Sequence, residues 1–181
     1  LSFNPSGNRF MFFHLWIKDG LRFSRLITAD ISGNNVFILN NEGPVSHYCW
    51  KSDKELLVYG YHQEGGFQYY LYKDQTNEKR VIGKDSFSED GHPSFLKNSQ
   101  FIITDTYPDK YGEQHLLLFN LQSQSLQNIN QFFSHPRFRG EIRCDLHPRI
   151  SPSGRLTCVD TSSSNKREMI ILSLADFLHN E

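Results

Sequence analysis

The feature that most constrains the fold of this chain is an internal repeat. In four segments a large apolar residue precedes a polar turn and then a run of β-forming residues; these apolar anchors are Phe3, Trp50, Phe95 and Ile150. Successive anchors lie 47, 45 and 55 residues apart. A period of about 45 residues with several strands per unit is typical of β-propeller blades.

Turn sequences separate the anchors from the strands that follow them. The strings Asn4-Pro5-Ser6-Gly7 and Ser151-Pro152-Ser153-Gly154 combine a Pro that presets φ with a Gly that accepts positive φ. Between such turns, β-forming residues predict strands. The predicted strands are 9–13, 23–29, 36–40, 55–61, 66–72, 79–82, 100–104, 115–121, 125–130, 156–160 and 168–174.

We therefore expect an all-β protein with about four β-propeller blades, each a four-stranded antiparallel sheet. The blade-like repeats cover residues 1–44, 45–89, 90–144 and 145–181 of a single propeller domain or fragment. The chain begins inside the first strand of a blade, which favours a piece of a longer propeller whose remaining blades would be its partners. The alternative is a β-sandwich in which the spacing is a coincidence.

Composition excludes several classes of function. The 181 residues carry 19 Lys and Arg against 20 Asp and Glu, so the net charge of -1 gives no basic surface for nucleic acid. No apolar run is long enough for a membrane helix. Three Cys do not make a disulfide framework, and free thiols favour a reducing compartment. Cytoplasm and periplasm both stay open, because the absence of an N-terminal export signal decides little.

Histidine recurs at one position of the repeat. His47, His92 and His147 each stand three residues before an apolar anchor. The innermost strands of propeller blades run beside a shared axis, so we expect these side chains to face one space. Imidazole is a metal ligand and a general base near neutral pH. Alternatively, His is a consensus residue of the repeat that caps a turn.

A second cluster surrounds the last of these histidines. Cys144 stands three residues before His147, and both could reach one ion that His92 also binds. A thiolate with imidazoles would favour zinc, whereas His with oxygen ligands would suit manganese. Alternatively, Cys144 is a small buried apolar residue, as we expect for Cys49 and Cys158.

Cationic side chains accumulate in the same stretch. Arg forms bidentate pairs with carboxylates, so a concave site lined by these residues would bind an anionic substrate. The alternative is that some of them are solvated or pair with Glu141 and Asp145. The arginines of this stretch are Arg137, Arg139, Arg143, Arg149 and Arg155, and Arg22 and Arg25 flank an earlier predicted strand.

Other candidates stand at predicted strand ends. Tyr107 follows the strand predicted at 100–104, where its hydroxyl could donate a proton or its ring could stack on a sugar. His62 holds the comparable place in the second repeat. His14 is a lesser candidate, and we expect Trp16 to be a packing residue.

These strings resemble the oligogalacturonate-lyase-like β-propeller proteins and, more distantly, the propeller ulvan lyases. The resemblance rests on Arg143-Cys144-Asp145-Leu146-His147-Pro148-Arg149, on Gly91-His92-Pro93-Ser94-Phe95 and on Thr104-Asp105-Thr106-Tyr107-Pro108. It implies a seven-bladed ring with a divalent metal, manganese or zinc here, and β-elimination of uronate-containing glycans.

The resemblance also implies roles for individual residues. His47 would be the catalytic base and His92, Cys144 and His147 the metal ligands, although Cys144 and Arg149 replace ligands of the family pattern. Arg22 or Arg25 would match the family's arginine, and His62 with Tyr107 would match the catalytic pair of the ulvan lyases. Arg22, Arg137, Arg143 and Arg149 would bind the acidic oligosaccharide or polysaccharide.

Two hypotheses of different classes follow. In the first, the chain is a carbon-oxygen lyase in which metal or Arg stabilises the enolate-like anion while His47 removes the C5 proton of a uronate. In the second, it is a non-catalytic propeller that binds carbohydrate or protein, because propellers serve both purposes.

Overall fold

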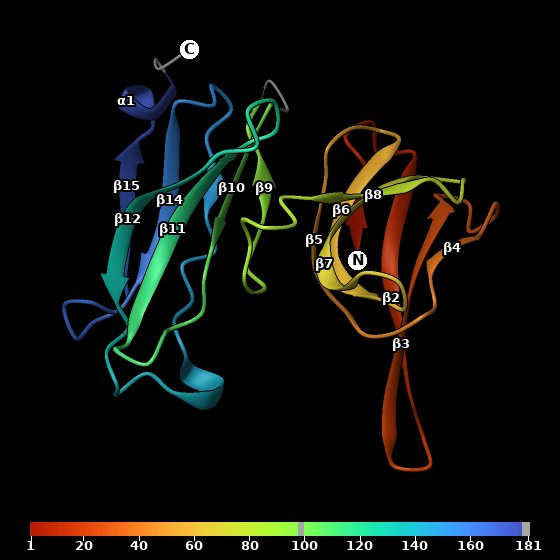
Figure 1. Cartoon of the computed structure of the whole chain (residues 1–181), viewed down its shortest axis with the longest axis horizontal. Helices are drawn as coiled ribbons and strands as arrows, with labels where there is room; N and C mark the ends of the chain where they lie inside the picture. Colours follow the sequence, from red (N-terminus) through yellow and green to blue (C-terminus); the bar gives the residue numbers. More distant parts are fainter. Residues whose placement is uncertain (98–99, 179–181) are drawn as a thin grey trace. The chain divides into compact units, whose positions relative to one another are not determined.

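Antiparallel sheets account for nearly all of the regular structure. The computed structural model describes residues 1–97 and 100–178, and Figure 1 shows their course. The first sheet consists of β1 (Ser2–Phe3), β2 (Arg9–Lys18), β3 (Leu21–Asp30) and β4 (Phe37–Asn40). The second consists of β5 (Val45–Trp50), β6 (Glu55–His62), β7 (Gly66–Lys73) and β8 (Lys79–Ile82).

The other two sheets follow the same up-and-down order. The third consists of β9 (Ser94–Phe95), β10 (Phe101–Asp105), β11 (Glu113–Asn120) and β12 (Leu126–Phe133). The fourth consists of β13 (Arg149–Ile150), β14 (Leu156–Thr161) and β15 (Glu168–Ser173). A 3-10 turn spans Gly140–Ile142, and the short helix α1 spans Ala175–Leu178. In the described residues, no helix has both the length and the apolar character to cross a membrane.

Each sheet lies within one predicted repeat, and neighbours in sequence are neighbours in the sheet, as in propeller blades. The all-β prediction is therefore confirmed. The described part of the fourth repeat forms three strands rather than the expected four. The seven-bladed ring stays a prediction.

The chain divides into two compact units, Leu1–Phe87 and Ser88–Glu181, which we call the first and second units. Each has its own apolar core between its two sheets. In the first unit the core consists of Met11, Leu26, Leu56, Val58, Tyr70 and Tyr72. In the second it consists of Leu96, Phe101, Ile103, Leu116, Leu118, Phe132, Leu146, Val159 and Leu174.

A buried ion pair supports the core of the first unit. The Arg9 side chain of β2 donates to the Asp74 carboxylate at 2.6 Å, and the Thr28 hydroxyl of β3 donates to the same carboxylate at 2.6 Å. Asp74 follows β7, so these bonds join the two sheets. A buried carboxylate needs such donors because burial removes it from water.

One hairpin is longer than the sequence predicts. β2 and β3 extend to Lys18 and back from Leu21, whereas the predicted strands end at 13 and restart at 23. Asp19 and Gly20 have φ of 51° and 76°, as a tight hairpin turn needs. The extension was missed because its apolar and charged residues show no clean alternation.

Candidate functional site

A buried carboxylate organises the loops that precede β9 and β13. The Asp105 side chain, at the end of β10, is fully buried. Its oxygens accept the backbone N–H of His92 at 2.6 Å and the backbone N–H of His147 at 2.9 Å. They also contact His92 Nδ1 at 2.9 Å. One carboxylate therefore holds together two loops that are 55 residues apart in sequence.

The loop before β9 comes very close to β10 at this point. A Cβ added to Gly91 would lie 1.9 Å from the Asp105 carbonyl oxygen. Only glycine lets the backbone approach so closely, and that approach places the His92 N–H on the carboxylate. Because an ionised carboxylate only accepts, the Nδ1–H of His92 is the donor in this contact.

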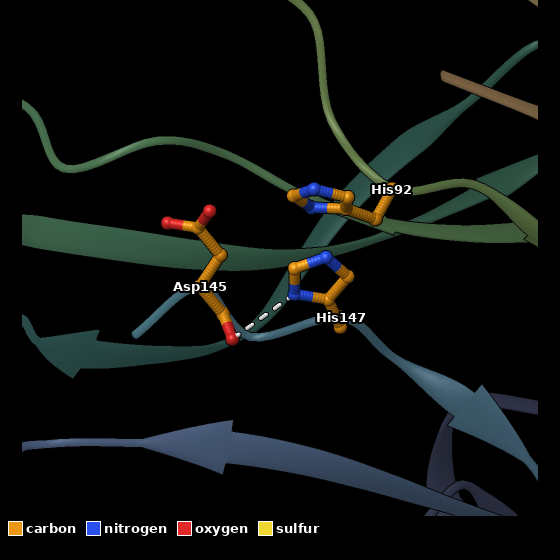
Figure 2. Close-up of side chains that lie close together, drawn as sticks. All are labelled: His92, Asp145 and His147. Carbon is orange, nitrogen blue, oxygen red and sulfur yellow. Dashed lines mark hydrogen bonds between the residues drawn. The ribbon is translucent and has the colours of Figure 1, made fainter. Parts of the chain in front are cut away.

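The two imidazoles that Asp105 organises lie against each other. The ring centroids of His92 and His147 are 3.6 Å apart, with an angle of 31° between the planes. Figure 2 shows the two rings face to face, with the Asp145 carboxylate beside them and a hydrogen bond from His147 Nδ1 to the Asp145 carbonyl oxygen. One ligand atom each from His92, Asp145 and His147 lies within 4.8 Å of the others.

The sequence prediction named Cys144 where the structure places Asp145. Cys144 and Leu146 are buried, whereas Asp145 is half-buried and His147 is exposed, with a left-handed backbone φ of 43°. Burial raises the pKa of the Cys144 thiol, which disfavours the thiolate that a metal binds. His92 and His147 therefore lie together as predicted, and a carboxylate accompanies them.

Arg143 forms a bidentate ion pair with the Asp145 carboxylate. Its Nε and Nη2 donate to the two oxygens at 2.5 and 2.8 Å. The guanidinium also lies 4.6 Å from the centroid of Tyr107, whose ring makes an edge contact with His92. Burial, followed by the charges of Asp90 and Asp145, raises the pKa of the Tyr107 hydroxyl. Tyr107 is therefore a neutral packing and hydrogen-bonding group at neutral pH.

A cavity of about 460 Å³ begins on the other side of Arg143. We call it the basic cavity, because its lining includes Lys110, His135, Arg139 and Arg143 but a single acidic residue, Asp109. The Asp109 carboxylate accepts the backbone N–H of Glu113 and Tyr111, and these bonds lower its pKa. Neither Lys110 nor Arg139 has an ion-pair partner in the described part of the chain. Aromatic rings of Tyr111, Phe133 and Phe138 complete the wall.

Two other predicted arginines do not line this cavity. Arg149 donates two hydrogen bonds to Asp160 at 2.8 and 2.9 Å, which lower the pKa of that carboxyl. Arg137 is exposed in the loop after β12, where its backbone N–H donates to His135 Nδ1. Arg149 is thus paired within its own sheet, with an acid other than the Glu141 and Asp145 that the alternative interpretation named.

The remaining candidates belong to the first unit. His47 lies inside β5, where its Nδ1 is 3.0 Å from the Ser46 hydroxyl, whereas His92 and His147 precede their strands. His62 is buried, with Nε2 2.7 Å from the Tyr72 hydroxyl and Nδ1 3.0 Å from the Glu42 carboxylate. Desolvation lowers the pKa of His62 although Glu42 opposes it. Arg22, Arg25, His14 and Trp16 all lie on the long β2–β3 hairpin.

Sequence reasoning missed the residues that organise the site. Asp105 was part of a quoted string, but its role depends on two backbone N–H groups that no pattern identifies. Its position at the end of an entirely buried strand was the available signal. Lys110 and His135 carried no signal, because only the fold places them near Arg143.

Comparison with solved structures decides the fold. TolB from Acinetobacter baumannii superposes with a TM-score of 0.68 at 15% identity over 94% of this chain and 39% of TolB. The chain has the β-propeller fold. A protein solved as a TolB candidate from Agrobacterium tumefaciens gives a TM-score of 0.68 at 11% identity over 95% of this chain and 60% of its own length.

The tricorn protease is similar over a smaller share of its length. It gives a TM-score of 0.55 at 14% identity over 93% of this chain and 17% of the protease. The chain thus spans about two fifths to three fifths of the two TolB-type proteins. No family model matches the sequence, and the search of curated proteins finds no match.

The expected kinship with oligogalacturonate and ulvan lyases is wrong. The structural neighbours are TolB-type propellers and the tricorn protease, and no sequence family supports the lyases. The strings that suggested the kinship are propeller turns and a loop whose charged residues pair with each other, as Arg143 does with Asp145. The catalytic role of Arg25 rested on that resemblance alone, and the catalytic roles of His47, His62 and Tyr107 stay predictions.

Proposed function

We propose that this chain is a non-catalytic β-propeller module that binds a carboxylate-bearing ligand in the basic cavity. The observation that carries the proposal is the charge of the lining. Lys110 and Arg139 have no ion-pair partner among the described residues, and the one acid, Asp109, already accepts backbone N–H groups. Likeness to TolB-type propellers supports the binding role over lyase activity.

The arrangement of the polar groups also favours binding over catalysis. Asp105 is buried and fully engaged in positioning two loops, and Asp145 is held bidentately by Arg143. This pairing makes that part of the surface rigid, because Asp105, Arg143 and Asp145 already have hydrogen-bond partners. A carboxylate ligand would find charge-assisted donors on Lys110 and Arg139 and apolar contact on the aromatic wall.

Carboxylates of this kind come from acidic oligosaccharides or from acidic peptides. Isothermal titration of the 181-residue chain with an oligogalacturonate and with an oligo-glutamate peptide distinguishes the two sources. Arg139→Gln and Lys110→Gln should each lower the affinity for whichever probe binds by a factor of about ten or more. The reason is that a lost charge-assisted hydrogen bond costs about 1.5–3 kcal/mol. Arg155→Gln, which removes an exposed cation from a turn of the fourth sheet, is the matched control.

Three results would refute this function. One is equal affinity for a neutral oligosaccharide of the same length. Another is unchanged affinity in both cavity variants. The third is an unsaturated sugar product that accumulates during incubation with the oligogalacturonate and disappears in the His47→Ala variant, since that would make the chain a lyase after all.

A divalent metal at His92, Asp145 and His147 is a second candidate function. The convergence of three ligand atoms within 4.8 Å favours it, and so does the Asp105 carboxylate behind His92, an arrangement that orients imidazole ligands. Two imidazoles with a carboxylate suit zinc or manganese. The bidentate bond from Arg143 to Asp145 competes with the ion.

Metal analysis of the purified chain tests this candidate. After dialysis against zinc or manganese, one ion per chain should remain, and His92→Ala or His147→Ala should remove it. His115→Ala, in β11, is the control. Metal content that no histidine variant changes would exclude this site, and it would leave the basic cavity proposal untouched.

A further inference from the structure

The first unit carries a two-stranded extension that its own sheet does not cover. β2 and β3 pair along their whole length, from Arg9 with Asp30 to Lys18 with Leu21. The neighbouring strands stop early, because β1 pairs with β2 only at Phe10 and Met11 and β4 pairs with β3 only at 26–28. Residues 14–25 therefore form a two-stranded ribbon, which we call the hairpin arm; in Figure 1 it extends beyond the other strands of its sheet.

The hairpin arm exposes large apolar side chains. Ile17 is 76% exposed, Leu21 64%, Leu15 47% and Phe23 39%. A two-stranded ribbon is marginally stable in water by itself and cannot bury these side chains in a core of its own. Leu21 and Phe23 lie on one face of the ribbon, and Leu15 and Ile17 lie on the other. Exposed apolar side chains rimmed by charge mark an interaction surface.

One face of the arm is an ordered aromatic and cationic platform. Directly paired residues share a face, so His14 and Arg25 lie beside Trp16 and Phe23. The Trp16 and Phe23 rings stack at 5.4 Å with 14° between their planes, and His14 lies 5.0 Å from Trp16. The Arg25 guanidinium lies 4.7 Å from the Trp16 centroid.

The charge of the arm is unbalanced. Residues 14–25 contain Lys18, Arg22 and Arg25 but only one acidic residue, Asp19. None of the three cations has an ion-pair partner among the described residues. Arg25 Nε is buried and, within the same residues, lacks a hydrogen-bond partner. The unpaired charges of Lys18 and Arg25, which lie on the same face of the arm, are complementary to carboxylates from another molecule.

We propose that the hairpin arm docks an acidic polypeptide segment that also carries apolar side chains. Carboxylates of the segment pair with Arg25 and Lys18, and its apolar side chains cover Trp16 and Phe23. The charge excess selects an acidic partner, and the exposed apolar side chains select a polypeptide over a purely ionic ligand. This surface lies in the first unit and does not depend on the basic cavity of the second.

Fluorescence anisotropy with the 181-residue chain tests the docking. The probe is a short labelled peptide that alternates Glu with Leu and Phe, and its counterpart carries Lys in place of Glu. The Glu peptide should bind at least about tenfold more tightly than the Lys peptide, with an affinity that falls as salt rises. Arg25→Gln and Trp16→Ala should each weaken it about tenfold, and Lys18→Gln and Leu21→Ser, on the same face, severalfold.

Matched controls separate docking from unfolding and from the basic cavity. Arg155→Gln and Ile171→Ser change exposed residues of the fourth sheet and should leave affinity unchanged. Lys18 and Leu21 lie at the exposed tip on the face of Trp16 and Phe23, so their variants keep the test valid even where Trp16→Ala perturbs the fold. Arg139→Gln should retain the peptide affinity of the arm.

Several outcomes would overturn the proposal. These are equal binding of the Glu and Lys peptides, losses in the control variants as large as in the arm variants, and loss of binding in Arg139→Gln but not in Arg25→Gln. Binding of phosphatidylserine vesicles without peptide binding would assign the arm to a membrane surface instead. A dimer that Ile17→Ser dissociates, with no peptide affinity, would assign it to a second copy of the chain.

Discussion

At the residue scale, Asp105 holds together the loops that precede β9 and β13. Its buried carboxylate accepts two backbone N–H groups and the N–H of one imidazole. The positions of His92 and His147 therefore depend on this one carboxylate. His92 and His147 owe their proximity to it, and so does any chemistry that they perform.

Replacing Asp105 tests that dependence. Asp105→Asn keeps the shape but turns one acceptor into a donor that faces an N–H group, so we expect a loss of about 3 kcal/mol in unfolding free energy. Urea titration followed by circular dichroism measures it. Asp176→Asn, an exposed acid of the same unit, should cost less than about 1 kcal/mol. Equal costs would show that Asp105 is not the organising residue.

His62 makes the first unit sensitive to pH. Burial lowers its pKa in the folded state, so the unfolded chain takes up the proton more readily. Stability from this group is complete above the ordinary pKa of about 6.5 and is lost as pH falls below it. The lowered pKa values of Asp30 and Glu42 act at lower pH, since their ordinary values are 3.8 and 4.5.

The urea midpoint should therefore fall between pH 7 and pH 5 in the native chain. In a His62→Gln variant the midpoint should change much less over the same interval, whatever its absolute value, because the titrating group is gone. His14→Gln, an exposed histidine, serves as the comparison and should keep the native slope. A slope that persists in His62→Gln would assign the pH dependence to other groups.

At the element scale, the hairpin arm is separable from the blade that carries it. The core of the first unit takes Met11 from β2 and Leu26 from β3, and no residue of 14–25 belongs to it. Because Trp16 and Phe23 are directly paired, a two-residue turn can close the ribbon there.

Replacing residues 17–22 by Asn-Gly, which keeps the buried Ser24 and its hydrogen bond from the Val45 N–H, should shorten the arm without unfolding the blade. We expect the free energy of unfolding to change by less than about 1 kcal/mol, since surface changes away from packed groups rarely exceed that size. Thermal unfolding by circular dichroism measures the change. Loss of the cooperative transition would mean that the arm contributes to the core.

At the scale of the whole molecule, the two units have separate cores. All buried members of one cluster lie in Leu1–Phe87 and all members of the other in Ser88–Glu181. In each unit the apolar side chains of two sheets pack against each other. Two sheets are the smallest number that can bury an apolar face in this way.

Each unit should therefore fold when expressed alone as 1–87 or 88–181. We expect a β-type far-ultraviolet spectrum and a cooperative urea transition for both fragments, with lower stability than the full chain because small domains bury less surface. A fragment divided inside a sheet, such as 1–64, is the negative control. An unfolded spectrum for either fragment would show that its core is not stable without the other unit.

The amino-acid sequence by itself determined the fold class, because blades are made from local patterns. A repeat of about 45 residues, Pro and Gly at turns, and short β-forming runs are each legible within a few residues. The pairing of His92 with His147 also followed from the repeat, since equivalent positions of neighbouring blades lie close together. Strand ends were less accurate, as the hairpin arm shows.

Only the tertiary structure decided which side chains make a site. Asp145 rather than Cys144 joins the histidines because Cys144 is buried beside Leu146 in the sequence, and Leu146 packs in the core of the second unit. Asp105 became central because two loops distant in sequence direct backbone N–H groups at it. Patterns of single residues carry no record of such distant convergence, since its geometry is produced by the packing of the sheets.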